Sequence, residues 1–353
     1  MLLKFGEVPV MVASSREAAK EILKTHDALL ATRPQTTTFK ILSKRGLGIA
    51  LAPYGDHWRQ LRKICNMALL SANHVRSFRA IREEEVARLV ESIMSASASA
   101  APLVNLSKMI AGYVADAALR AIMGNRLKAR ARDAFIDQLA EGVRLAAGFS
   151  LADLYPSSRL ARLLSRSSRK MEIHREAMLE LMDIVVGEHM QRDGGLQIPL
   201  TMDTVKGVII DLFAGSNDTS ATTLEWAMAE LMRNPTVMSK LQDEVRGAFA
   251  ATMKVSEGGL DELSYLHMVI KETLRLHLPA PLLLPRESQE QCQILGYDAN
   301  VELALANLAF YFDWSLPEGL SCSELDMTET AGVTVRKKTD LWVRATPSSL
   351  LPR

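Results

Sequence analysis

The sequence predicts a mainly α-helical protein with small β-sheets, and three observations lead to this fold class. Apolar residues recur at spacings of three and four through most of the chain. Two-residue alternation is confined to the two ends of the chain. Of the 353 residues, 48% are hydrophobic and only 24% are charged, so a substantial core can form.

The composition also argues against several classes of protein. The formal net charge is +1, which gives no sign of nucleic-acid binding. No apolar run reaches the ~18 residues of a membrane span, and the first residues do not form a signal peptide. The three cysteines are odd in number and far apart, which favours a reducing compartment over a disulfide framework. The seven histidines show no metal-binding spacing, so no metal ligands are predicted among them.

The first half of the chain is predicted to contain one hairpin followed by helices. Apolar residues flank the hairpin turn at Gly6, and Ser14 and Glu17 have the spacing of a capping box. The helical periodicity that follows is interrupted near Ser71. The elements expected here are a hairpin over residues 2–14, a helix over 14–30, two helices between 57 and 94, and further helices over 103–192.

The second half contains the longest predicted helix, residues 201–233, which ends at Asn234 and Pro235. At ~1.5 Å per residue it would span roughly 45 Å, enough to cross a whole domain. The elements expected after it are helices over 234–249 and 263–276, an extended proline-rich segment over 278–288, a helix over 299–314 and a second hairpin over 332–345.

A cluster of polar residues lies in the middle of the long apolar helix, in the stretch DLFAGSNDTSATTLEW. Buried polar groups are unfavourable unless each finds a partner. Hydroxyl side chains can bond back to the preceding turn, widen it and leave a groove that faces a ligand. A satisfied helix–helix contact would explain the same residues equally well. The cluster consists of Ser216, Asn217, Asp218, Thr219, Ser220, Thr222 and Thr223.

Two further pairs of residues have helical spacing. Glu272 and Arg275 are three residues apart and can form an ion pair, which by itself is usually a solvated surface pair. Trp58 and Arg62 are four residues apart, so an indole donor and a guanidinium share one face and suit a carboxylate or phosphate. Taken alone, the second pair is more typical of an amphipathic helix with a snorkelling arginine.

Taken together and in this order, these motifs resemble the cytochrome P450 family of haem-thiolate monooxygenases. The stretches ATRP, GDHWRQLRK and ATTLEWAMAELMRNP are similar to the branch of that family found in plant secondary metabolism. The resemblance covers nearly the whole chain. It implies one cytochrome P450-type domain over residues 1–353.

The resemblance implies haem as the cofactor and a distal oxygen site on the central helix. In this family an acid–alcohol pair, here Asp218 and Thr219, delivers protons to bound oxygen. Ser216 stands where glycine is common, and it is small enough to keep a groove beside the helix. The implied activity is hydroxylation of a small lipophilic plant metabolite, such as a terpenoid, with electrons from NADPH through a cytochrome reductase.

The same resemblance assigns the two helical pairs. Trp58 and Arg62 would bind a haem propionate, and Arg286, in PLLLPRES, is a weaker candidate for that role. Glu272 and Arg275 would form a buried structural ion pair instead of a surface pair.

One part of the family pattern is absent from the sequence. The family's haem iron is bound by a cysteine thiolate in a loop of the pattern F-x-x-G-x-R-x-C-x-G, and no such loop occurs here. The chain passes directly from Asp298 to Ala299, where that loop is expected. The fold would therefore be incomplete on the proximal side. None of Cys65, Cys292 and Cys322 lies in a stretch that resembles the missing loop.

Two shorter differences accompany this one. The family's N-terminal membrane anchor is absent, and a further skip is expected near Arg192. The family lies on the cytosolic face of the endoplasmic reticulum membrane, so this chain is expected to be cytosolic or peripherally attached. The basic stretch over residues 157–175, ordinarily a solvated helix face, would lie near the substrate entrance and the membrane.

Three interpretations follow from the missing loop. In the first, the chain is a catalytically inactive relative of the monooxygenases. In the second, it is a non-catalytic protein that binds a hydrophobic ligand or a partner, because the helix over 299–314 would expose its apolar face. In the third, the transcript contains the missing segment and encodes an ordinary enzyme.

Overall fold

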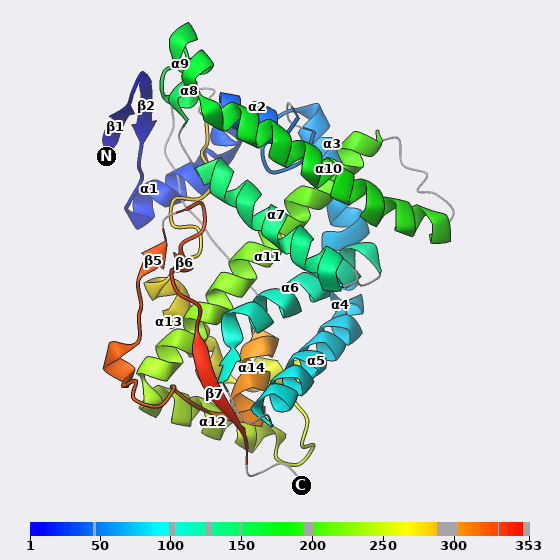
Figure 1. The fold of residues 1–353 in the computed structure, drawn as a ribbon, viewed down its shortest axis with the longest axis vertical. Coiled ribbons are helices and arrows are strands. Elements are labelled where there is room, and N and C mark those ends of the chain that lie inside the picture. The colour runs from blue at the N-terminus through cyan, green and yellow to red at the C-terminus, as the bar shows by residue number, and fades with distance from the viewer. Residues whose placement is uncertain are drawn as a thin grey trace. The chain divides into compact units, whose positions relative to one another are not determined.

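The computed structural model confirms a mainly α-helical fold with small antiparallel sheets (Figure 1). The chain divides into two compact units, so the single domain expected over residues 1–353 stays a prediction. Unit 1 comprises residues 1–72, 127–215 and 282–299, and unit 2 comprises residues 73–126, 216–281 and 300–353. The structure describes residues 1–44, 47–98, 103–124, 129–147, 150–193, 201–287, 302–330 and 332–348.

Unit 1 begins with the predicted hairpin, formed by β1 (Leu2–Phe5) and β2 (Val8–Met11). The helix α1 (Arg16–Lys20) follows it. Its N-cap is Ser15, whose hydroxyl accepts a backbone N–H of the first turn, and not Ser14 as the capping-box spacing predicted. The chain then continues in a π-helical turn and a 3₁₀ turn, so the single helix expected over 14–30 is broken into short pieces.

In unit 1, α2 and α7 both pack against α10 and against each other, and α8 lies against α2 and α9. Phe135 on α7 meets Phe213 edge to face, with ring centroids 5.1 Å apart, which is a favourable aromatic geometry. The α-helices of unit 1 after α1, up to the long helix described next, are α2 (Thr37–Leu42), α3 (Asp56–Cys65), α7 (Ala129–Ala147), α8 (Leu151–Leu154), α9 (Arg159–Leu164) and α10 (Arg166–Asp193).

The longest helix, α11 (Met202–Arg233), has 32 residues and contributes to both units. It confirms the element predicted over 201–233. At 1.5 Å per residue it is roughly 48 Å long. It ends before Asn234 because Pro235 lacks a backbone N–H and instead begins α12 (Pro235–Phe249).

The core of unit 2 surrounds α14 (Glu302–Tyr311). Leu305 and Leu308 are both 0% exposed, because α5 (Arg79–Ser97), α12 and α13 (Ser264–Leu276) pack against this helix. The expectation that the helix over 299–314 exposes an apolar face is therefore wrong. Its neighbours within unit 2 cover that face.

The strands of unit 2 form two small antiparallel sheets. In the larger sheet, β7 lies between β3 and β4, and in the smaller one β5 pairs with β6. The second hairpin predicted over 332–345 is wrong, because its two halves, β6 and β7, belong to different sheets. The strands are β3 (Leu103–Asn105), β4 (Phe312–Ser315), β5 (Glu329–Thr330), β6 (Arg336–Lys337) and β7 (Trp342–Pro347).

Unit 2 also contains α4 (Ala72–Ser77), α6 (Leu106–Met123) and two 3₁₀ turns, over Glu257–Glu262 and Cys322–Glu324. None of the described helices combines the length and the apolar character needed to cross a bilayer.

Candidate functional site

The middle of α11 exposes small residues and buries a carboxylate. Gly215 and Ser216 are exposed, and a Cβ at Gly215 would meet no atom within 4 Å. Asp218, in contrast, is only 4% exposed. The Thr223 hydroxyl donates to the Thr219 carbonyl at 2.8 Å, yet the helix stays α-helical through this turn. The helix therefore has an open side at residues 215–216 without the widened turn that the sequence suggested.

The Asp218 carboxylate is bound by the segment that joins β5 to β6. The Thr334 hydroxyl donates to one carboxylate oxygen, and the Arg336 guanidinium forms an ion pair with the other. Burial lowers the pKa of the Arg336 guanidinium from its ordinary value. Thr219, the predicted alcohol partner, is half-buried on the next position of the helix. In this structure β6 and the turn before it thus contact the Asp218 carboxylate, and its Oδ1 accepts no hydrogen bond among the described residues.

Trp58 and Arg62 share one face of α3, as their spacing predicted. The Arg62 guanidinium lies over the indole ring, 5.1 Å from its centroid, in a cation–π arrangement. The indole Nε1–H of Trp58 donates to the Ile49 carbonyl at 3.0 Å, so this donor is satisfied by backbone. Arg62 is exposed, and no carboxylate among the described residues pairs with it. The charge that can receive an anion here therefore belongs to Arg62.

Arg286 lies beside a second guanidinium, that of Arg33. Arg286 pairs with Asp27 at 2.6 Å. Arg33 is held by backbone carbonyls, since its Nε donates to Ala50 at 3.0 Å and its Nη1 donates to Pro285 at 3.1 Å. Burial and the neighbouring Arg286 charge lower the pKa of Arg33 to about 10. Two guanidinium groups in this setting favour a carboxylate or phosphate beside them.

A buried carboxylate that the sequence did not mark, Asp211, fastens a loop to α11. Its Oδ2 accepts the backbone N–H groups of Ile49 and Ala50 at 2.7 and 2.9 Å. A Cβ at Gly48 would lie 1.9 Å from this oxygen, so only glycine fits there. Burial raises the pKa of Asp211 from 3.8 to about 6, against the opposing effect of the two N–H bonds. The only signal in the sequence was an acidic residue in an otherwise apolar stretch.

The ion pair between Glu272 and Arg275 forms, but it is exposed. Two hydrogen bonds of 2.7 Å join the guanidinium to the carboxylate. The two side chains are 55% and 66% exposed, so the expectation of a buried pair is wrong in this structure. No described residue covers the pair, which leaves an i, i+3 contact on the surface of α13.

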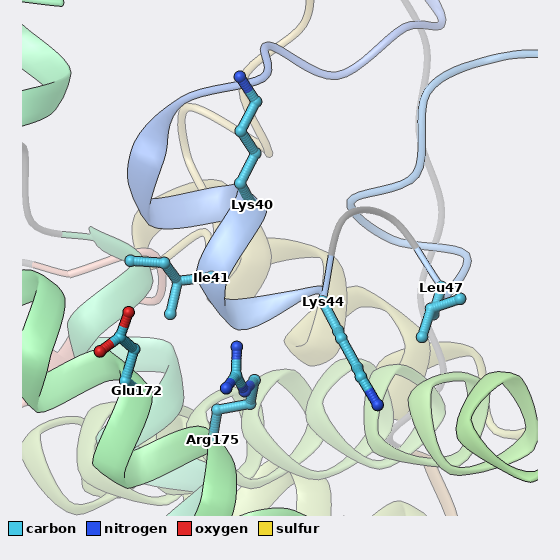
Figure 2. Close-up of a pocket in the computed structure, with 6 residues that line it drawn as sticks. All are labelled: Lys40, Ile41, Lys44, Leu47, Glu172 and Arg175. Carbon is cyan, nitrogen blue, oxygen red and sulfur yellow. The ribbon is translucent and has the colours of Figure 1, made fainter.

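A cavity of 530 Å³ opens in unit 1 between α2 and α10 (Figure 2). Figure 2 shows the Arg175 guanidinium pointing from α10 towards α2. Four of its six lining residues carry charge, so the cavity is a poor match for a small lipophilic substrate. It contains none of the predicted site residues. Its lining consists of Lys40, Ile41, Lys44, Leu47, Glu172 and Arg175.

The two described cysteines differ in burial, because Cys65 is buried and Cys322 is partly exposed. Cys65 is 4% exposed and packs with Leu61 and Val208, and burial raises the pKa of its thiol. Cys322 begins a short 3₁₀ turn that also contains the acidic residue Glu324. Cys292 and the Asp298–Ala299 junction lie outside the described residues. The guanidinium groups described above can bind the carboxylates of a haem, and the buried Cys65 does not fit its axial thiolate.

The comparisons with known proteins identify the family. A sequence model of the cytochrome P450 family matches residues 1–302. Desmethyl-deoxy-podophyllotoxin synthase from Sinopodophyllum hexandrum is 37% identical over 97% of this chain and 84% of its own length. Dolabradiene monooxygenase from Zea mays is 38% identical, and 5-epiaristolochene 1,3-dihydroxylase from Nicotiana tabacum is 36% identical, with similar coverage. The chain belongs to the cytochrome P450 family.

A solved structure and the length of the alignments add two points. A solved structure of a zebrafish cytochrome P450 with abiraterone shares the fold at a TM-score of 0.75, with 17% identity, covering 99% of this chain and 95% of that chain. The alignment with the podophyllotoxin synthase extends over 430 positions, although this chain has only 353 residues. The alignment therefore opens gaps in this chain, in agreement with internal segments that are shorter than those of its relatives.

Proposed function

We propose that this chain has the architecture of a plant monooxygenase for a small lipophilic metabolite but does not carry out turnover itself. Membership of the cytochrome P450 family supports the class of activity. A terpenoid substrate is favoured because the relatives include a dolabradiene monooxygenase and a 5-epiaristolochene dihydroxylase. In such a parent enzyme, electrons come from NADPH through a cytochrome reductase.

Residue roles in the parent site form part of this proposal. Asp218 and Thr219 are assigned to proton delivery, supported by their position beside the open side of α11 at residues 215–216. Arg62 and Arg286 are assigned to the haem propionates, supported by the exposed charge of the first and the paired guanidinium groups around the second. Trp58 takes a supporting role, because its indole holds the Ile49 carbonyl and stacks under Arg62.

The observation that carries the proposed inactivity is the missing thiolate donor. A haem bound in this family relies on a cysteine thiolate to favour cleavage of the O–O bond. The sequence lacks the F-x-x-G-x-R-x-C-x-G loop, and Cys65 is a core residue with a raised thiol pKa. Without that donor, the guanidinium groups of Arg62 and Arg286 could bind the carboxylates of a porphyrin. No thiolate would then favour cleavage of the O–O bond at its iron.

Spectroscopy of the reduced protein under carbon monoxide tests this proposal. The full chain is expressed with added haem precursor, reduced and exposed to carbon monoxide. We expect no thiolate-type Soret band. A thiolate-type band that disappears in Cys292→Ala or Cys322→Ala would refute the proposal, and Cys65→Ala serves as the matched control.

The alternative of a non-catalytic binding protein loses its support in the described part of the chain. That interpretation depended on an exposed apolar face on α14, and this face is buried in unit 2. The third interpretation would hold if the transcript had additional codons between Asp298 and Ala299. The longer protein encoded by that transcript would then be the active enzyme.

Attachment to the cytosolic face of the endoplasmic reticulum is also proposed, supported by a leucine-rich surface on α9. Leu160, Leu163 and Leu164 are 65%, 83% and 60% exposed. Arg159 and Arg162 lie on the same short helix and can meet anionic lipid headgroups. Sedimentation with anionic phospholipid vesicles should fall on Leu163→Glu. Equal sedimentation of the variant and the wild type would contradict the assignment.

A further inference from the structure

The cavity between α2 and α10 has the size of a ligand site (Figure 2). Its volume is 530 Å³, and cavities that bind small molecules measure about 300–1,000 Å³. All of its lining residues belong to unit 1, and none of them is assigned a role in haem binding or proton delivery. Two apolar side chains, Ile41 and Leu47, line it together with four charged ones. The charged groups therefore decide which class of ligand fits.

One of these charged groups, Arg175, stands in the buried stripe of α10. Met171, His174 and Met178 are 2%, 9% and 4% exposed, at the spacing of three and four residues that marks the inner face of a helix. Nδ1 of His174 lies 2.9 Å from Oε1 of Gln138 on α7, which fixes this face towards the interior of unit 1. Arg175 follows Met171 by four residues and precedes Met178 by three. A guanidinium thus occupies a position where the pattern favours an apolar side chain.

The Arg175 guanidinium lacks acceptors for its N–H groups. Its Nε is buried and makes no hydrogen bond among the described residues. Its Nη2 is 3.6 Å from Oε1 of Glu176, too far for a hydrogen bond, and the Glu176 side chain is 66% exposed, so this ion pair is weak. A buried donor without an acceptor is unfavourable. An oxygen atom of a ligand in the cavity would supply that acceptor.

The two lysines that line the cavity are less suited to receive an anion. The Lys44 ammonium forms an ion pair with Asp203 on α11. Figure 2 shows the Lys40 ammonium pointing away from the Arg175 guanidinium. The same view shows the guanidinium directed towards α2. Arg175 is therefore the cation of this lining that is best placed to bind a ligand.

Acidic neighbours limit the charge that such a ligand can carry. Glu172, one helical turn before Arg175, lines the cavity and forms no ion pair with a described residue. Together with Glu176 it would repel a second negative charge on the ligand. A carboxylate carries one negative charge, and its two oxygens match the planar fork of a guanidinium. The composition of the lining therefore favours a carboxylate over a phosphate dianion.

We propose that this cavity binds a small organic carboxylate with an apolar body. One carboxylate oxygen accepts the Nε–H of Arg175, and the apolar body of the ligand contacts Ile41 and Leu47. The inference goes beyond the proposed function, because neither haem nor the residues assigned to it take part in this binding.

Calorimetric titration of the full chain tests the class of ligand. Octanoate is compared with 1-octanol, which lacks the charge, and with octyl phosphate at about pH 8, where a phosphate monoester is doubly charged. Octanoate should bind at least about tenfold more tightly than 1-octanol, and octyl phosphate should bind more weakly than octanoate. Equal binding of octanoate and 1-octanol would overturn the proposal, and tighter binding of octyl phosphate would overturn the choice of a carboxylate.

Two matched variants of α10 test the role of Arg175. Arg175→Gln should weaken octanoate binding at least about tenfold, as expected for loss of a charge-assisted hydrogen bond. Arg169→Gln removes the same charge from an exposed position on the same helix outside the cavity, and it should leave the affinity unchanged. An equal affinity in Arg175→Gln and the wild type would overturn the assignment.

A methyl resonance locates the ligand in the wild type. Isoleucine labelled with ¹³C at Cδ1 gives a signal for Ile41 that Ile41→Val identifies. Octanoate should move this signal, and the movement should saturate with the affinity found by calorimetry. An Ile41 signal that stays in place at saturating octanoate would overturn the proposed site, even if Arg175→Gln does not fold. Neither measurement requires haem, so neither depends on the carbon monoxide experiment.

Discussion

Asp211 makes the stability of the fold depend on pH, and Asp211→Asn should remove that dependence. Burial raises the pKa of this carboxyl from 3.8 to about 6 in the folded chain. Between these two values the folded chain keeps a proton that the unfolded chain has lost. The free energy of unfolding therefore falls as the pH rises through this window and levels off above it. The whole effect corresponds to roughly 3 kcal/mol.

Urea unfolding of both proteins between about pH 4.5 and about pH 7.5 measures the effect. Over this range the wild type should lose roughly 2 kcal/mol relative to Asp211→Asn. The asparagine carbonyl can still accept the N–H groups of Ile49 and Ala50, so the charge alone is removed. Asp211→Ala, which leaves both N–H groups unpaired, should be less stable at every pH by about 1–3 kcal/mol for each group. Parallel pH profiles for the wild type and the asparagine variant would refute the reasoning.

Three further predictions concern Gly48, the two described cysteines and Arg33. Gly48→Ala should lower the free energy of unfolding by about 2 kcal/mol or more, because its Cβ would lie 1.9 Å from a carboxylate oxygen. Gly247→Ala, a helical control with no atom within 4 Å, should raise it by about 0.5–1 kcal/mol, and equal effects in urea unfolding would contradict this. Iodoacetamide should alkylate Cys322 at least about tenfold faster than Cys65 in the native chain, because burial raises the pKa of the Cys65 thiol. Peptide mapping measures both rates, and equal labelling counts against the buried position. Arg33→Lys should lower the free energy of unfolding by roughly 1–3 kcal/mol, since an ammonium cannot reproduce the fork of bonds to backbone carbonyls. An unchanged urea midpoint would argue against that role.

Local signals in the sequence correctly predicted those elements whose ends are marked by nearby residues, such as a proline or a tight turn. The helix over 201–233 was predicted because its periodicity is long and Asn234–Pro235 closes it, and the structure ends it at Arg233. The N-terminal hairpin follows in the same way from alternation around a tight turn. The segment over 332–345 misled because β7 pairs with strands far away in sequence, a choice that alternation cannot indicate.

The same difference between local spacing and contacts with distant segments applies to the candidate site. Spacing correctly placed Trp58 with Arg62, and Glu272 with Arg275, on shared helix faces. Spacing could not predict that the second pair is exposed, because burial depends on which other segments pack over α13. The role of Asp211 was also beyond the sequence, since its partners are backbone groups of a loop more than a hundred residues earlier.

The position of β7 in its sheet sets the order in which unit 2 can be completed. This strand, Trp342–Pro347, joins β3 near residue 104 with β4 near residue 313, and it is synthesised after both. Until β7 has been synthesised, β3 and β4 have unpaired backbone edges. Such edges favour aggregation. Unit 2 therefore closes only after translation has reached Pro347. A stop codon before Trp342 would leave β3 and β4 without the partner they share.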